Sequence, residues 1–168
     1  MATIINPSNF VLKLELPIDN IGIQEWIDDN EPDILDKTLG VELSDEFTTA
    51  LAGAPDQKWL DLRDGVKYTD SSGNKQRYKG IKRIITEYVY VIIISAKQTL
   101  STDSGVKSQK TDNAEDASPR YTQKEAHNDM VNRIAVMNDF INISNDADSS
   151  TYENYLPQLI GKVNIFNI

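Results

Sequence analysis

The stretch GIKRIITEYVYVIIISAKQ, residues 80–98, decides the fold. Its first half places apolar side chains at helical spacing, which predicts a long helix. A buried strand is the alternative, because the run 89–94 is rich in β-branched residues. The early 3.6-residue periodicity and the length of the segment favour the helix. From Tyr88 onward the segment is apolar nearly all round, which predicts burial on every side, by its own domain or by neighbouring subunits. The residues expected to share one face are Ile81, Ile84, Ile85, Tyr88, Val91, Ile92 and Ser95.

The chain before this segment predicts three shorter helices and a β-hairpin. The first helix begins at Asp19 or Asn20, is interrupted at Pro32 and ends at Gly40. Apolar residues at helical spacing predict a second helix over 41–53, and a third runs from an Asp56 cap to Gly65. Two short β-favouring pieces around a turn at Gly73 predict a hairpin over 66–79. The apolar positions of the first two helices are Ile23, Trp26, Ile27, Ile34, Leu35, Leu39, Leu43, Phe47, Ala50 and Leu51.

The chain after residue 98 alternates between polar and amphipathic segments. Residues 101–120 contain one clearly apolar side chain, Val106, which predicts a long protruding polar loop. Residues 121–144 predict an amphipathic helix, opened by a capping box of Thr122 and Glu125. A short helix interrupted near Pro157 is expected over 151–161. The apolar stripe of the 121–144 helix is Met130, Val131, Ile134, Met137 and Ile141.

The two ends of the chain are apolar and have the pattern of strands. FVLKLEL (10–16) alternates, and KVNIFNI (162–168) is a second extended apolar segment. Each end can add a strand to a neighbouring subunit, or the ends can pair with each other or with the 66–79 hairpin. The expected fold is therefore mainly α: a helical bundle built around a long two-helix hairpin, with a small β-hairpin and extended N- and C-terminal arms. It divides into an N-terminal arm (1–18), a helical domain (19–144) and a C-terminal short helix with an extended tail (145–168).

Composition excludes several classes of protein. The 168 residues include no cysteine, so disulfides, thiolate catalysis and cysteine-based zinc sites are excluded. The most apolar run, 88–96, is too short to span a bilayer. The first residues lack the basic and long apolar regions of a signal peptide. We expect a soluble protein of one domain, made in the cytoplasm.

Charge is distributed unevenly along the chain, whose net charge is −9. Residues 15–64 hold 14 acidic and three basic side chains, for a net charge of −11. Residues 65–100 hold seven basic and two acidic side chains, for a net charge of +5. Opposite charges steer and register interfaces, so this polarity suits contacts between copies of the chain. Solvated faces on a soluble protein explain the same charges without any partner.

The sequence contains no recognisable catalytic motif. The single histidine, His127, lies near the edge of an apolar stripe and is expected to be structural. Two calcium-like starts, at Asp70 and Asp146, lack the required residues at loop positions six and twelve. Four clustered carboxylates could hold Mg²⁺ for phosphoryl transfer, but no basic residue with a recognisable role accompanies them, and an acidic solvated helix end is favoured. These are Asp28, Asp29, Glu31 and Asp33. We expect no catalytic residue, no cofactor and no bound metal.

About two-thirds of the chain resembles a known family of virion proteins. The elements that carry the resemblance are LGVELSDEF (39–47), KWLDLRDGVKYTDSSGNKQRYKGIKRIITEYVYVII (58–93), GV (105–106), NAEDASP (113–119) and NRIAVMNDFI (132–141). Their order, helix, hairpin, long helix, polar loop and long helix, resembles the head–tail connector (adaptor) proteins of tailed bacteriophages. The likeness is to those of crAss-like phages and other phages of Bacteroides-type gut bacteria.

The resemblance implies a ring of identical subunits, commonly twelve, between the portal protein and the tail or other connector proteins. The ring would surround the DNA channel, where DNA passes without specific binding, and would have no enzymatic activity and no membrane contact. It implies a protein of the virion, at the head–tail interface, made in the host bacterial cytoplasm. Two alternatives remain: a metal-dependent phosphoryl-transfer enzyme using Asp28–Asp33, and a small cytoplasmic interaction module.

Partner contacts are expected in the polar loop, in the basic segment and in the arms. The loop candidates are Val106, Lys107, Asn113, Glu115, Asp116, Pro119 and Arg120. The candidates for contacts between subunits are Arg77, Lys79, Lys82, Arg83, Phe10, Leu12, Leu14, Ile165 and Phe166.

Overall fold

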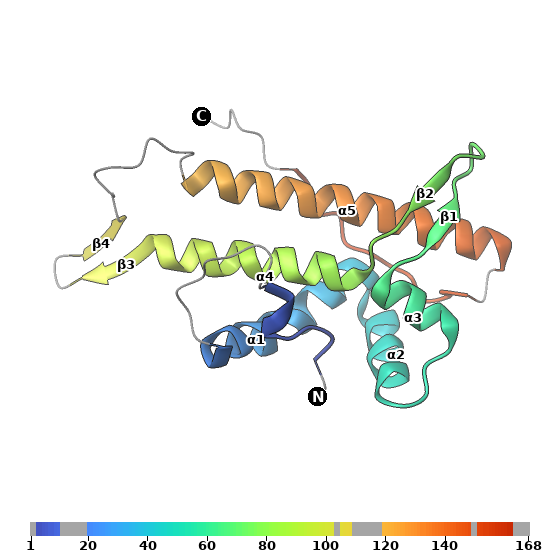
Figure 1. The fold of residues 1–168 in the computed structure, drawn as a ribbon, viewed down its shortest axis with the longest axis horizontal. Coiled ribbons are helices and arrows are strands. Elements are labelled where there is room, and N and C mark those ends of the chain that lie inside the picture. The colour runs from blue at the N-terminus through green and yellow to red at the C-terminus, as the bar shows by residue number, and fades with distance from the viewer. Residues whose placement is uncertain (1–2, 11–19, 103–104, 109–118, 149–150, 163–168) are drawn as a thin grey trace.

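The computed structural model describes residues 3–10, 20–102, 105–108, 119–148 and 151–162. The prediction of a mainly helical fold with a small β-hairpin is confirmed (Figure 1). The elements are η1 (Pro7–Phe10), α1 (Asn20–Leu39), α2 (Val41–Ala52), α3 (Gln57–Asp64), β1 (Lys67–Thr69), β2 (Lys75–Arg77), α4 (Ile81–Gln98), β3 (Thr99–Thr102), β4 (Gly105–Ser108) and α5 (Pro119–Ala147).

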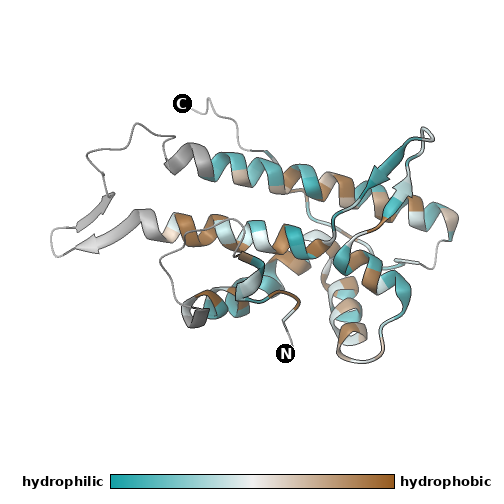
Figure 2. Ribbon diagram, viewed as in Figure 1, coloured by the Kyte–Doolittle hydropathy of each residue, from teal (hydrophilic) through white to brown (hydrophobic). Residues whose placement is uncertain are grey.

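Helix α4 is the centre of the fold, packed between α5 and α1 (Figure 1). The helical reading of this segment is therefore correct. Its core stripe differs from the expected one: Val89 and Ile93 are fully buried, whereas Val91 and Ile92 are half-buried and Ser95 is exposed. The chain's own domain does not bury α4 on every side, because α5 and α1 cover a stripe of the helix, whose apolar positions extend along much of its length (Figure 2). Burial of the remaining face by neighbouring subunits stays a prediction. The fully buried apolar positions of α4 are Ile81, Ile84, Ile85, Val89 and Ile93.

Helix α1 runs without interruption through Pro32, so the predicted break there is wrong. Proline removes one backbone donor, and it is tolerated here because Pro32 lies on the exposed side of the helix. Ile27 before the proline and Ile34 after it are both buried, so the two halves of α1 pack on the same core. Gly40 then ends α1 with a φ of 86°, as expected of a helix stop.

The second and third helices begin and end close to the predicted residues. Leu43 and Phe47 of α2 are fully buried, and Trp59 and Leu62 anchor α3. Asp56 precedes α3, but its side chain makes no capping hydrogen bond, contrary to the prediction. The hairpin that follows is confirmed as the antiparallel pair β1–β2.

The predicted polar loop is partly structured. Strands β3 and β4 pair as an antiparallel hairpin, with Thr99 opposite Ser108. Helix α5 then begins at Pro119, earlier than predicted, because proline fits the first turn of a helix, where its missing N–H would be unpaired anyway. Thr122 consequently lies inside the helix and not at its cap, so the predicted capping box is wrong.

The segment after α5 returns along α1 rather than forming the predicted short helix. Residues 151–154 form a turn, and 155–162 are neither helix nor strand. The Leu156 N–H donates to the carbonyl of Leu39 at 3.0 Å, and the Gln158 N–H to that of Lys37 at 2.8 Å. Most of the apolar tail, 163–168, lies outside the described residues.

The start of the chain packs against the body. Phe10 belongs to the 3-10 helix η1 and not to a strand, and both Ile5 and Phe10 are buried in the core. The rest of the predicted strand, 11–16, lies outside the described residues. None of the helices described here is long and apolar enough to cross a membrane.

Candidate functional site

The β1–β2 hairpin has two chemically different faces, because successive side chains of a strand point to opposite sides. Lys67 lies opposite Arg77, and Thr69 lies opposite Lys75, so these residues share one face. The other face contains the pair Tyr68 and Gln76, together with the next pair along, Val66 and Tyr78, whose backbones exchange two hydrogen bonds.

The inner face fixes the hairpin on α5. The ring of Tyr78 is buried and stacks on Phe140, with centroids 5.0 Å apart, and Tyr68 meets Phe140 edge-on at 5.7 Å. The Tyr68 hydroxyl donates to Asp139 at 2.7 Å, and the Tyr78 hydroxyl donates to the Leu62 carbonyl at 2.9 Å. Burial is the main reason why the pKa of both phenols lies above its ordinary value. These contacts anchor the hairpin on α5 and α3.

The outer face is exposed, and all of its charged side chains are cationic. It comprises Lys67, Lys75, Arg77 and Lys79, called the cationic face below. Like charges directly opposite each other destabilise a strand pair, as Lys67 and Arg77 do here. Within the described chain these four side chains form no ion pair. The surface therefore has uncompensated positive charge available for a partner.

The one acidic residue of the hairpin, Asp70, stabilises the turn between its two strands. Asp70 accepts hydrogen bonds from the N–H groups of Ser72 and Asn74 and from the side chain of Gln76. These bonds, that of Gln76 above all, hold the pKa of Asp70 below its ordinary value. Its carboxylate fixes the turn geometry that displays the lysines, and the failed calcium-like pattern is explained by this turn.

The four predicted basic candidates divide into two pairs. Arg77 and Lys79 belong to the cationic face, whereas Lys82 pairs with Asp64 at 2.9 Å. Arg83 pairs with Glu87 at 3.1 Å. The structure therefore gives Lys82 and Arg83 partners inside the chain.

Sequence reasoning missed an ion pair beneath this surface. Glu87 of α4 is fully buried, and the Nε of Arg133 donates to both of its carboxylate oxygens, at 2.7 and 2.9 Å. A single acid within the apolar pattern of α4 was the available signal. Its partner, 46 residues away, could not be named from the sequence.

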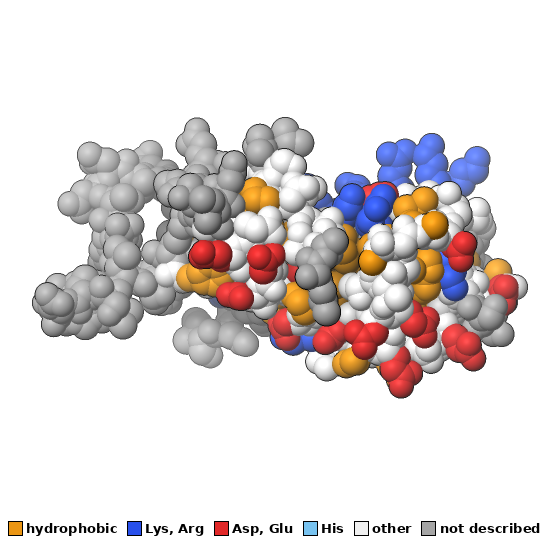
Figure 3. Space-filling view, turned by 90° about the horizontal axis from the view of Figure 1, so that it is seen from below, with side chains coloured by type: hydrophobic (Ala, Val, Ile, Leu, Met, Phe, Trp, Pro, Cys, Tyr) orange, Lys and Arg blue, Asp and Glu red, His pale blue; other side chains and the backbone are white. Residues whose placement is uncertain are grey.

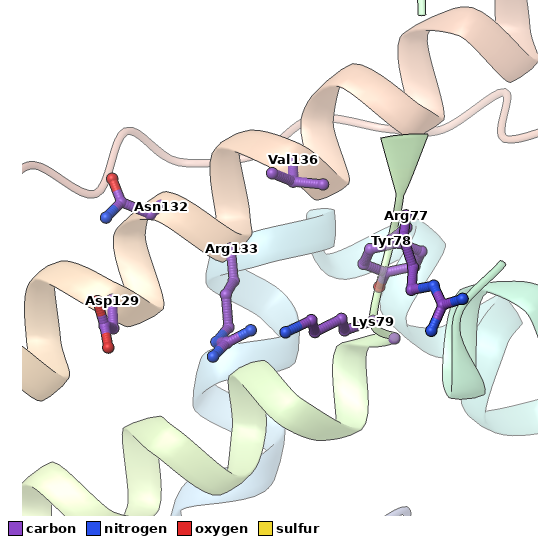
Figure 4. Close-up of a pocket in the computed structure, with 8 residues that line it drawn as sticks. Arg77, Tyr78, Lys79, Asp129, Asn132, Arg133 and Val136 are labelled. Carbon is purple, nitrogen blue, oxygen red and sulfur yellow. The ribbon is translucent and has the colours of Figure 1, made fainter. Parts of the chain in front are cut away.

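A pocket of about 280 Å³ lies between the end of the hairpin and α5. Lys79 and Arg133 point toward each other across it, while Arg77 points away (Figure 4). The Nε of Arg133 is engaged by Glu87. Two cations converging on one pocket can receive a carboxylate or another small anion. The lining residues are Arg77, Tyr78, Lys79, Gly80, Asp129, Asn132, Arg133 and Val136.

The carboxylates of the predicted acidic cluster diverge around α1. Glu31 is buried and accepts the backbone N–H groups of Ile4 and Ile5, at 2.7 and 3.0 Å. Burial raises the pKa of Glu31 above its ordinary value, although these N–H groups act in the opposite direction. Asp33 pairs with Lys37 at 2.7 Å. Among the residues that the structure describes, no group of three or more metal-ligating side chains is placed to hold an ion.

The other predicted candidates are dispersed. Val106 and Lys107 fall in β4, and Pro119 and Arg120 open α5. Phe10 is buried in the chain's own core, so its side chain is not exposed for contact with another subunit. His127 contacts the Gly161 carbonyl at 3.1 Å, in keeping with a structural role. The candidates outside the described residues are Leu12, Leu14, Asn113, Glu115, Asp116, Ile165 and Phe166.

The cationic face is thus the feature that a partner could use most directly, and the pocket beside it extends the same positive charge towards α5. Comparison with known proteins finds no family, no curated protein and no solved structure that matches this chain.

Proposed function

We propose that this chain is a structural virion protein, a head–tail connector subunit that forms a ring between portal and tail around the DNA channel. The observation that carries the proposal is the order of its elements. Helix α3, the hairpin β1–β2, the long helix α4, the segment 99–118 and the long helix α5 follow one another. The resemblance to phage connector proteins rests on this order. The one difference is that the β3–β4 hairpin stands in the region where a polar loop was expected.

The shape of the chain supports this role. Helices α4 and α5 lie side by side and place β3–β4 at the end of the molecule away from α2 and α3 (Figure 1). A segment placed at such an end is positioned to contact a second protein while the body contacts a neighbour. In this proposal residues 99–118 contact the portal protein, the tail or another connector.

In this role the chain acts by protein–protein contacts alone and needs no cofactor. The acidic residues of α1–α3 give the subunit negative charge that repels DNA, which lets the genome pass without sticking. The protein would be located at the head–tail interface of the virion after synthesis in the bacterial cytoplasm.

The proposal is tested by measuring particle mass and imaging the assembly. Native mass spectrometry and cryo-electron microscopy class averages of the purified chain, alone and with the portal protein of the same virion, should show a closed ring. A chain that stays monomeric with the portal present would refute the connector role and favour a small interaction module. Mg²⁺-dependent phosphatase or nuclease turnover that is lost in Asp28→Asn/Asp29→Asn would refute it in favour of the enzyme.

A further inference from the structure

An acidic groove lies between α1 and α2, away from the hairpin. It has a volume of about 440 Å³, and its acidic side chains include Asp28, Asp36 and Asp45. The hydroxyl-bearing residues Ser44 and Thr48 also line it. Within the described chain, none of the three aspartates forms an ion pair. The name acidic groove refers below to these three aspartates and their surroundings.

The two charged regions lie apart on one molecule. Figure 3 shows Lys and Arg side chains gathered at one edge and most Asp and Glu side chains spread over the opposite part of the same view. One copy cannot bring its hairpin to its own groove, because Tyr68 and Tyr78 hold the hairpin on α5. The unpaired charges can therefore neutralise each other only between copies.

We propose that the cationic face of one copy docks into the acidic groove of a second copy. This inference rests on the proposed function, since a ring needs one repeated contact between unlike faces. A contact that joins two different patches is heterologous and leaves a free patch of each kind for the next copy. Closure of such a chain of contacts gives a ring.

The dimensions of the two regions match. An extended backbone rises about 3.3 Å per residue, so the row from Lys75 through Arg77 to Lys79 spans about 13 Å. A helix rises about 1.5 Å per residue, so Asp28 and Asp36 stand about 12 Å apart along α1. Basic side chains can thus meet both ends of the groove at once, with Asp45 of α2 beside them.

Charge also decides between a second copy and nucleic acid. Double-stranded DNA would bring its phosphates close to a chain of net charge −9, whose acidic helices repel it. A second copy presents the opposite charge in a groove of matching length. The cationic face is four residues wide, which suits a protein contact better than a DNA-binding surface.

Two reciprocal charge reversals test the contact. Lys75→Glu/Arg77→Glu leaves the cationic face with two charges of each sign and no net positive charge, and Asp36→Lys/Asp45→Lys leaves Asp28 as the only acid among the three positions that define the acidic groove. Each variant alone should associate more than about tenfold more weakly than the unaltered chain in sedimentation velocity. An equimolar mixture of the two should assemble again, with the two variants alternating around the ring. At one contact the reversed hairpin positions meet the reversed groove positions, and at the next an unaltered cationic face meets an unaltered groove.

Controls separate charge from folding and from other surfaces. Circular dichroism should be the same for all variants, since Asp45, Lys75 and Arg77 are exposed and none of the altered side chains is fully buried. Lys162→Glu and Glu125→Lys reverse exposed charges outside both regions and should leave association unchanged. Association of the unaltered chain should weaken as salt is raised beyond about 0.15 M, where screening acts within about 8 Å.

The outcomes distinguish this inference from the connector proposal. Rings that form equally well from either reversed variant would overturn the docking contact and leave the connector role standing. A closed dimer that both reversals abolish and the mixture restores would support the contact and refute the ring. A double-stranded DNA probe that binds the unaltered chain but not Lys75→Glu/Arg77→Glu, while self-association is unaffected, would overturn the docking contact in favour of nucleic acid.

Discussion

The guanidinium of Arg133 in α5 binds the fully buried carboxylate of Glu87 in α4, with Nε–oxygen distances of 2.7 and 2.9 Å. Arg83, one turn before Glu87 on α4, binds the same carboxylate at 3.1 Å. The pair joins the two long helices, and its Arg133 also lines the pocket together with Lys79 (Figure 4). It therefore couples the stability of the helix pair to the geometry of the cationic surface.

Arg133→Met should destabilise the fold because it leaves Glu87 buried with one fewer positive partner. Removal of one member of a buried ion pair costs about 3–5 kcal/mol, whereas the double variant Glu87→Met/Arg133→Met should recover much of that loss. Urea unfolding followed by circular dichroism measures both. Lys37→Met, which breaks the exposed pair with Asp33, is the control and should cost at most about 1 kcal/mol. Equal losses in the two single variants would contradict the importance of burial.

Ile93→Asp should prevent folding, whereas Ile92→Asp should be tolerated better. Ile93 is fully buried and Ile92 only half-buried. A carboxylate without a partner at position 93 should lower the free energy of unfolding by more than about 4 kcal/mol. Soluble expression and thermal unfolding of the two variants compare neighbouring positions directly. If Ile92→Asp proved the more damaging, the stripe assigned to α4 would be incorrect.

Gly65→Ala should be much more damaging than Gly73→Ala. Both residues have positive φ, 95° and 84°, which costs an alanine about 1–2 kcal/mol. At Gly65 an added Cβ would also lie 2.4 Å from the Tyr78 carbonyl oxygen, whereas nothing lies within 4 Å at Gly73. Chemical denaturation should give a loss at Gly73 close to the backbone cost alone and a clearly larger loss at Gly65. Similar losses would mean that the close approach of α3 to the hairpin can relax.

The contribution of Glu31 to the free energy of unfolding, measured against Glu31→Gln, should be larger at acidic pH than at neutral pH. Burial raises the pKa of this carboxyl above 4.5, so the folded chain binds the proton more tightly than the unfolded chain does. Its contribution to stability is full below pH 4.5 and is lost as the pH rises through the raised pKa. The difference in unfolding free energy between the unaltered chain and Glu31→Gln should therefore fall as the pH rises above 4.5 through the raised pKa of Glu31.

Asp33→Asn supplies a control of opposite sign for this measurement. Its hydrogen bond with Lys37, and then that with Tyr88, hold the pKa of Asp33 below 3.8. The contribution of Asp33 is present at neutral pH and is lost as the pH falls through its lowered pKa. A pH profile with the same slope for both variants would show that at least one of the two carboxyls does not behave as its surroundings require.

Replacement of residues 99–118 by a short Gly/Ser connection should leave the helices folded but block attachment to the portal or tail. The segment joins α4 and α5, which pack against each other along their own apolar faces, so a short connection can close the pair. Circular dichroism and particle infectivity measure the two effects. Infectious particles assembled from the shortened chain would show that this segment is only a spacer.

Sequence by itself determined the main helices, the β1–β2 hairpin and the distribution of charge along the chain. The 3.6-residue pattern of 80–98 gave its helix despite the β-branched run, and the turn chemistry around Gly73 gave the hairpin, because these signals lie within a few residues of each other. The excess of basic residues over 65–100 was visible as a count. Helix ends were less certain, as Pro119 shows, because a proline can either precede or open a helix.

Tertiary structure decided which residues meet. Pro32 stays inside α1 because packing on both sides of it outweighs its local preference. Whether a basic side chain is neutralised depends on its distance from acidic side chains on other helices and strands, and the local sequence pattern carries no information about that distance. Lys82 reaches Asp64, whereas Lys79 has no acidic partner among the described residues. The cationic face thus exists because the fold places its bases on the exposed side of a hairpin whose aromatic side is buried.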